Sequence, residues 1–144
     1  MPGMTLDESA RSLAGAVAAE QELFEVVGGW VAETADPVPK LVFARQSRRH
    51  GEHALRLLAL LPETRDHDPA ALVAAAATVP AVRDLAAPDR VSGLLAALRA
   101  QQDRLVAYLA AASPVRDGPG IRVAGEVLVA SRVDVEELEG LGPR

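Results

Sequence analysis

The sequence predicts an all-α protein folded as a four-helix bundle. Apolar residues recur at helical spacing in four long segments, and no segment shows the alternation typical of a β-strand. Hydrophobic residues make up 49% of the 144 residues but aromatic residues only 3%, so Ala, Leu and Val must form the core. Ala and Leu have high helix propensity. Four amphipathic segments with mostly short links indicate one bundle domain over 1–144.

The first helix is predicted over 6–35. Thr5 and Glu8 have the spacing of a capping box, which starts the helix near residue 6. The helix is expected to fade at Gly28–Gly29 and to end before Asp36-Pro37. Its apolar stripe consists of Leu6, Ala10, Leu13, Val17, Phe24, Val27 and Val31.

The second long helix is predicted over 37–61, because proline suits a first helical turn and Pro62 follows its last apolar residue. A short alanine-rich helix is expected over 70–78, ended by Pro80. The connection to the third long helix, roughly 25 residues, is the one long link. It can carry the chain back along the bundle, so the helices that it joins can run parallel.

The third and fourth long helices are predicted over 88–112 and 119–139. Pro88-Asp89 opens the third helix, Ser113-Pro114 closes it, and the turn VRDGPG leads into the fourth. The buried side of the third carries Val91, Leu94, Leu98, Leu105 and Leu109. That of the fourth carries Ile121, Leu128, Val135 and Leu138.

Three polar residues interrupt the apolar faces of the first two helices. Glu20 lies between Val17 and Phe24, where an unpaired carboxylate would cost several kcal/mol. It therefore lies at the stripe edge, pairs with an arginine, or faces a polar partner in the core. His50 and His53 share one helix face, so both imidazoles can reach one point in the core. They are either hydrogen-bonded packing residues or metal ligands and catalytic groups.

Polar residues also lie on the inward faces of the later helices, where they form a candidate ligand pocket. Their default role is that of hydrogen-bonded core residues. His67, in the polar loop PETRDHDP, is expected to be exposed. The candidate pocket residues are Gln101, Gln102, Tyr108, Ser131 and Asp134.

Charge and composition exclude several function classes. A net charge of −5 opposes nucleic-acid binding, and the small basic cluster in ARQSRRH is expected to pair with surface glutamates. Its arginines are Arg45, Arg48 and Arg49, and the glutamates are Glu22, Glu25 and Glu52. There is no cysteine, no signal-peptide pattern and no apolar stretch of the roughly 18 residues that a membrane span needs. We expect a cytoplasmic protein that binds neither nucleic acid nor membranes.

The stretches LFEVVGGWV, RRHGEHALRLLALLP and SPVRDGPGIR resemble small actinobacterial ferritin-like proteins, and the resemblance spans most of the chain. In di-metal members of the ferritin-like superfamily one helix supplies a Glu, the next supplies Glu-x-x-His, and a second helix pair repeats this set. Glu20 matches the first ligand. The run from His50 to His53 matches the second, with His50 where the family has Glu. The resemblance implies a ferritin-like bundle with one long crossover.

The second half departs from the family pattern. Gln101 or Gln102 stands where the family has Glu, and the run from Ser131 to Asp134 stands where it has Glu-x-x-His. A normal di-iron centre and iron storage are therefore not expected. Glu20, His50 and His53 keep the composition of a 2-His-1-carboxylate site for one iron or other divalent metal.

Two function classes follow from this resemblance. The first is an oxidoreductase or related small-molecule enzyme that uses one metal ion. The second is a metal-free binding or accessory module that recognises a small ligand, or that dimerises with itself or with a partner protein.

Overall fold

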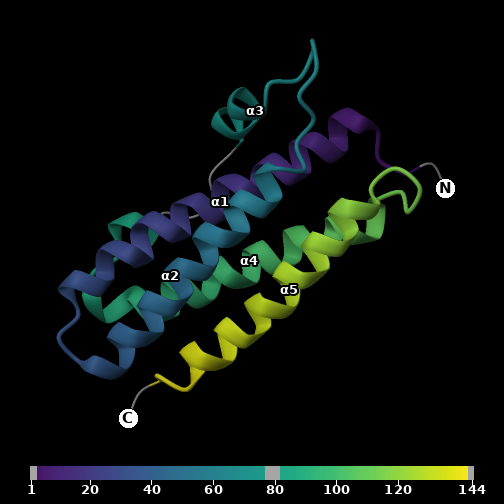
Figure 1. Ribbon diagram of the computed structural model, residues 1–144. Helices are drawn as coiled ribbons and strands as arrows, with labels where there is room; N and C mark the ends of the chain where they lie inside the picture. Colours follow the sequence, from purple (N-terminus) through teal and green to yellow (C-terminus); the bar gives the residue numbers. More distant parts are fainter. Residues whose placement is uncertain (1–2, 77–81, 143–144) are drawn as a thin grey trace.

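The computed structural model describes residues 3–76 and 82–142, and these residues form four long helices and a short one (Figure 1). The long helices are α1 (Leu6–Glu33), α2 (Pro37–Leu58), α4 (Arg90–Ala111) and α5 (Gly118–Glu139). The short helix α3 (Pro69–Ala75) packs on α1, and the 3₁₀ turns Val82–Asp84 and Ala87–Asp89 precede α4. The prediction of an all-α fold with helices packed as a bundle is confirmed.

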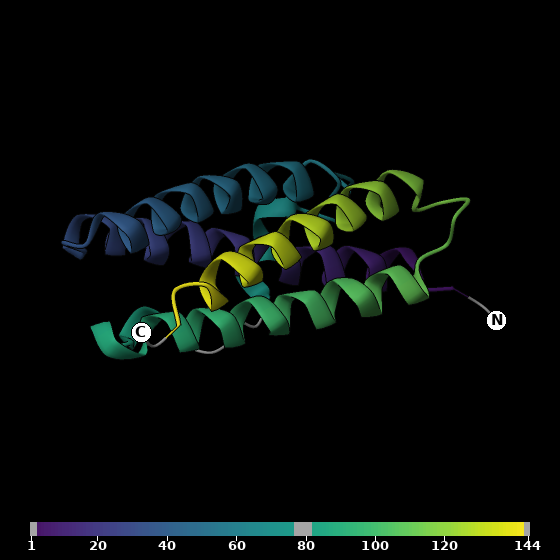
Figure 2. The same cartoon turned by 90° about the horizontal axis from the view of Figure 1, so that it is seen from below.

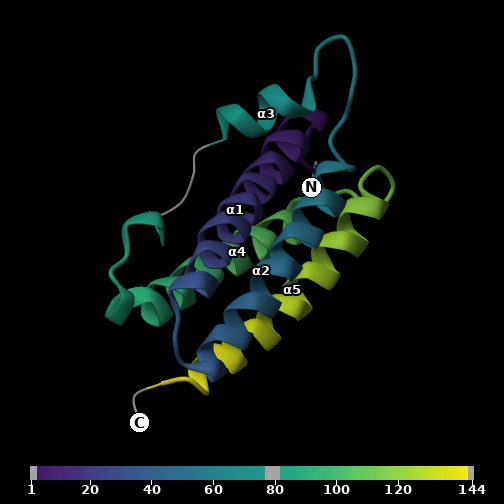
Figure 3. The same cartoon turned by 60° about the vertical axis from the view of Figure 1, so that its left-hand side comes forward.

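The long helices pack as two pairs, α1 with α2 and α4 with α5, and the pairs meet through α1 on α4 and α2 on α5 (Figure 2). The two helices α2 and α4 run in the same direction (Figure 3). They do so because α2 ends and α4 begins at opposite ends of the bundle. The long connection between them carries the chain back along the bundle, as predicted. The expected end of the short helix at Thr78 and Pro80 lies outside the described residues.

The helix ends follow the capping signals in the sequence. Glu8 donates its backbone N–H to the Thr5 hydroxyl at 3.2 Å, and its carboxylate accepts from the Thr5 backbone at 2.7 Å. At the start of α2, Asp36 accepts a hydrogen bond of 3.0 Å from the Val38 backbone. Side-chain caps satisfy backbone donors that have no helical partner, so these starts are fixed locally.

The prediction that the first helix fades at Gly28–Gly29 was wrong, because α1 continues to Glu33. A Cβ at Gly28 would lie only 2.8 Å from the Ser47 hydroxyl oxygen. That hydroxyl donates a hydrogen bond of 2.9 Å to the carbonyl of Phe24. Gly28 therefore lets α2 approach α1 closely, and it does not end the helix.

The core consists of two apolar clusters, one toward each end of the bundle. One contains Leu13, Val17, Leu57, Leu105 and Val127, and the other contains Leu23, Trp30, Phe43, Leu94, Leu98 and Leu138. Phe24 was expected in this core but is 48% exposed on the α1–α2 surface. The stripe is alanine-rich and broad, so spacing alone does not fix its edge.

No helix in the two described stretches is both long enough and apolar enough to cross a membrane.

Candidate metal centre

A layer of buried polar side chains crosses the bundle between the two apolar clusters, and every long helix contributes to it. Its members are Glu20 from α1, His50 and His53 from α2, Gln101 from α4, and Ser131 and Asp134 from α5. None of them is more than 8% exposed. Buried polar groups are costly unless they are paired or bind something, so this layer is where a site is expected.

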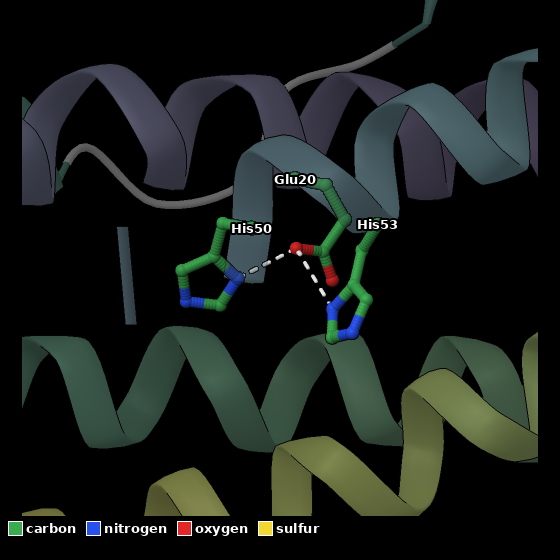
Figure 4. Close-up of side chains that lie close together, drawn as sticks. All are labelled: Glu20, His50 and His53. Atoms are coloured by element: carbon green, nitrogen blue, oxygen red, sulfur yellow. Dashed lines mark hydrogen bonds and ion pairs between the residues drawn. The ribbon is translucent and has the colours of Figure 1, made fainter. Parts of the chain in front are cut away.

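Glu20, His50 and His53 converge within this layer (Figure 4). The Nδ1 atom of His50 lies 2.6 Å from Oε2 of Glu20, and the Nδ1 atom of His53 lies 3.9 Å from the same oxygen. One donor atom from each residue lies within 4.8 Å of the others. Glu20 thus faces the core and pairs with an imidazole, and neither the stripe edge nor an arginine accommodates it.

The donor set and spacing fit a single divalent metal ion. Metal–ligand bonds of ~2.1 Å would place neighbouring donors ~3.0–3.4 Å apart. The two measured separations, 2.6 Å and 3.9 Å, fall on either side of this range, so small side-chain rotations would admit an ion. Two imidazole nitrogens and one carboxylate suit Fe(II) and Zn(II) and leave coordination positions open.

Gln101 holds the Glu20 carboxylate in place from α4. Its Nε2 donates to Oε1 of Glu20 at 3.3 Å and to the Ala16 carbonyl at 3.1 Å. The amide cannot turn over, because its oxygen accepts a hydrogen bond of 2.7 Å from Arg104. Burial lowers the pKa of Arg104. Gln101 therefore donates to one carboxylate oxygen while the other faces the two imidazoles.

Burial also sets the protonation state of His53. It lowers the pKa of His53, and the nearby negative charge of Glu20 offsets this only in part. The imidazole of His53 is therefore neutral near pH 7. A metal needs a neutral imidazole, so His53 is ready to bind one without first losing a proton.

Asp134 is the most deeply buried acid of the layer. Arg49 donates to Asp134 and to Glu137, both on α5. Burial still raises the pKa of Asp134 to about 6, and the hydrogen bond and charge of Arg49 offset this rise only in part. Asp134 is thus a carboxyl group that prefers its neutral form more than an exposed aspartate does.

The prediction for the basic cluster was correct for one arginine. Arg48 pairs with Glu52 at 3.0 Å, as the spacing predicts. Arg45 bonds Glu137 at 2.7 Å, and Arg49 also turns to α5, so Glu22 and Glu25 are not their partners. The packing of α5 along α2 is a tertiary contact that local spacing does not reveal.

The structure separates the predicted ligand-pocket residues. Gln102 follows Gln101 on α4, and its side chain donates a hydrogen bond of 3.1 Å to the Ser131 hydroxyl on α5. Tyr108 lies two turns along α4 from Gln101 and lines a different cavity, of about 350 Å³, together with Asp117. A ligand pocket that includes all five residues stays a prediction.

His67 lies outside the polar layer and is less exposed than expected. Its side chain is 12% exposed, and its Nε2 lies 2.6 Å from Oδ1 of Asp7 on α1. Its Nδ1 lies 2.8 Å from the Thr64 hydroxyl. His67 therefore ties the loop before α3 to the start of α1.

The arrangement gives the chain a buried group, Glu20 with His50 and His53, that could hold one metal ion. Sequence reasoning identified these three residues but did not foresee that Gln101 and Arg104 orient the carboxylate. Comparisons with protein-family models, curated proteins and solved structures give no match to this chain. Its function must therefore be argued from the site itself.

Proposed function

We propose that the protein binds one divalent metal ion, Fe(II) in the first instance, through Glu20, His50 and His53. One observation carries the proposal. Two imidazole Nδ1 atoms face the same carboxylate oxygen in the buried polar layer of the bundle. A buried group of this kind is costly to fold, and a bound cation would compensate for that cost.

The ferritin-like resemblance supports the same proposal. The parallel course of α2 and α4 agrees with a bundle that has one long crossover. Ligand chemistry limits the site to one ion, because the Gln101 amide presents N–H, not oxygen, to Glu20. A second ion between α1 and α4 would therefore lack the carboxylate that bridges the two ions in di-metal sites.

With iron bound, the centre would supply one-electron redox chemistry, which fits an oxidoreductase or related small-molecule enzyme. The residues of the chain keep the His53 imidazole neutral, fix the carboxylate through Gln101, and exclude bulk water. The side chain of His53 is 11% exposed against 2% for Glu20 and His50. A small substrate would therefore approach from the side of His53.

A surface groove favours a second candidate function, that of a binding or accessory module. The cavity, of about 860 Å³, lies between α1 and α2, and its lining includes Phe24, Leu55, Glu25 and Arg48. Phe24 is 48% exposed and Leu55 is 70% exposed. Acidic and basic residues flank this apolar surface, so a second copy of the chain could pair with it. Light scattering of the wild type and of Leu55→Asp would detect a homodimer and its loss.

Anaerobic calorimetric titration of metal-free, untagged protein with Fe(II) or Co(II) tests the metal proposal. We expect about one equivalent to bind to the wild type and none to His50→Ala or His53→Ala. His67→Ala is the matched control and should bind like the wild type. Bound metal should stabilise the fold by about 2.7 kcal/mol when the free metal is a hundred times Kd. If the wild type does not bind metal, the accessory function is favoured.

A further inference from the structure

Four buried polar atoms have no hydrogen-bond partner in the interface between α2 and α5. They are Oε1 of Gln46, Nε of Arg49, Nε2 of His50 and Oδ2 of Asp134, considered within the described residues. Buried polar atoms are rarely left unpaired without a functional or solvent-related reason. His50 belongs to the candidate metal centre, so its free nitrogen links this interface to the site.

Contacts from α2 place Asp134 level with His50. Gln46 donates from its side chain to the backbone carbonyl of Asp134 at 3.1 Å, and Arg49 donates to Oδ1 of Asp134. Residues 46, 49 and 50 share one face of α2, because residues three and four apart on a helix are neighbours. His50 therefore lies on the face of α2 that packs against Asp134, and its Nε2 is buried there without a partner among the described residues.

A metal ion would use Nδ1 of His50, the atom that faces Glu20. The remaining ring proton must then lie on Nε2, which becomes a hydrogen-bond donor. Histidines that bind metals almost always donate this second N–H to a carboxylate, a carbonyl or a water, which fixes the tautomer and orients the ring. Among the residues that the structure describes, Oδ2 of Asp134 has no partner, while Oδ1 is already engaged by Arg49.

We propose that Asp134 is a positioning residue for the metal centre, accepting the Nε2–H of His50 directly or through one ordered water. Asp134 stands where di-metal ferritin-like proteins have a metal ligand. In this chain it would bind the ring of His50 and would not contact the metal. Arg49 and Gln46 hold Asp134 in this role. This inference rests on the proposed metal site.

The experiment compares Co(II) binding and the proton NMR spectra of Co(II)-loaded wild type, Asp134→Ala, Asp134→Asn and Glu137→Gln. In the wild type each ligating imidazole should give one hyperfine-shifted N–H signal that disappears in D₂O. In Asp134→Ala we expect the His50 signal to be lost to exchange, the His53 signal to remain, and Kd to rise 10- to 100-fold.

Asp134→Asn keeps an acceptor oxygen and should retain the His50 signal, so it preserves the test if the alanine variant folds poorly. Glu137→Gln is the matched control, since it removes the other carboxylate partner of Arg49, and it should leave Kd and both signals unchanged. If the wild type binds Co(II) and Asp134→Ala leaves Kd and the His50 signal unchanged, the positioning role is wrong and the metal site stands. If the wild type binds no Co(II), the metal site and this role both fail.

Discussion

The imidazole of His50 and the carboxylate of Glu20 form a hydrogen bond of 2.6 Å across the α1–α2 interface, with each side chain only 2% exposed. A buried pair of this kind seldom stabilises a fold more than well-packed apolar residues would. The two residues lie between apolar clusters that could have continued through this level. Under the proposed function the pair serves to bind a metal ion and not to stabilise the fold, and this difference can be measured.

A double-mutant cycle on Glu20 and His50 separates the two explanations. Glu20→Leu or His50→Leu alone should destabilise metal-free protein by about 3–5 kcal/mol, because each leaves a buried partner unpaired. The double variant should recover most of this loss or exceed the wild type. Urea unfolding in the presence of a chelator gives the free energy of unfolding of the wild type and of the three variants. A double variant that is still less stable than the wild type by as much as either single variant would show that the pair is retained for stability.

The pH dependence of stability should reveal the buried carboxyl of Asp134. Its pKa is raised from 3.8 to about 6 in the folded protein. The folded state thus binds the proton more tightly than the unfolded state, and the stability that Asp134 contributes is lost as pH rises from about 4 through 6. Relative to Asp134→Asn, the wild type should lose about 2 kcal/mol over this interval. A difference that stays flat or grows with pH would mean that the ion pair with Arg49 outweighs burial.

Two adjacent glycines test the close approach of α1 and α2. Alanine at exposed Gly29, where an added Cβ meets nothing within 4 Å, should stabilise the helix by about 0.5–1 kcal/mol. Alanine at Gly28 should destabilise the protein, because its Cβ would displace the Ser47 hydroxyl from the Phe24 carbonyl. Melting temperatures of the two variants should shift in opposite directions. Equal upward shifts would show that Ser47 moves aside at no cost.

The basic cluster should not confer nucleic-acid binding. Arg45, Arg48 and Arg49 all pair with carboxylates, and the net charge of the chain is −5. Phosphate contacts would have to replace these pairs against a repulsive field. We expect no gel shift of short DNA or RNA duplexes at 50 mM salt. A complex of micromolar affinity that weakens steeply with salt would contradict this expectation.

The sequence predicted the features that depend on neighbours along a helix. The capping box at Thr5 and the proline at position 37 indicated two helix starts, and the spacing of His50 and His53 placed both imidazoles on one face. Glu20 was recognised because a carboxylate interrupted an apolar stripe. All of these signals act within one or two turns, so they survive any arrangement of the other helices.

The sequence could not predict features that depend on contacts between helices. Gln101 and Gln102 differ by about 100° around α4, and only the packing of α4 on α1 selects Gln101 as the partner of Glu20. The pairing of Arg49 with Asp134 likewise requires the register of α2 against α5. These contacts set the orientation of the site, and they arise only once the bundle has assembled.

The most direct measurement of the metal site is anomalous X-ray scattering at the cobalt edge from crystals grown with Co(II). The account predicts one strong peak in the core, bound by Nδ1 of His50, Nδ1 of His53 and the carboxylate of Glu20 at ~2.0–2.2 Å. The peak should be absent from crystals of His53→Ala and present in those of His67→Ala. Cobalt bound only at surface carboxylates or at His67, with His50 still bonded to Glu20, would contradict the proposed metal centre.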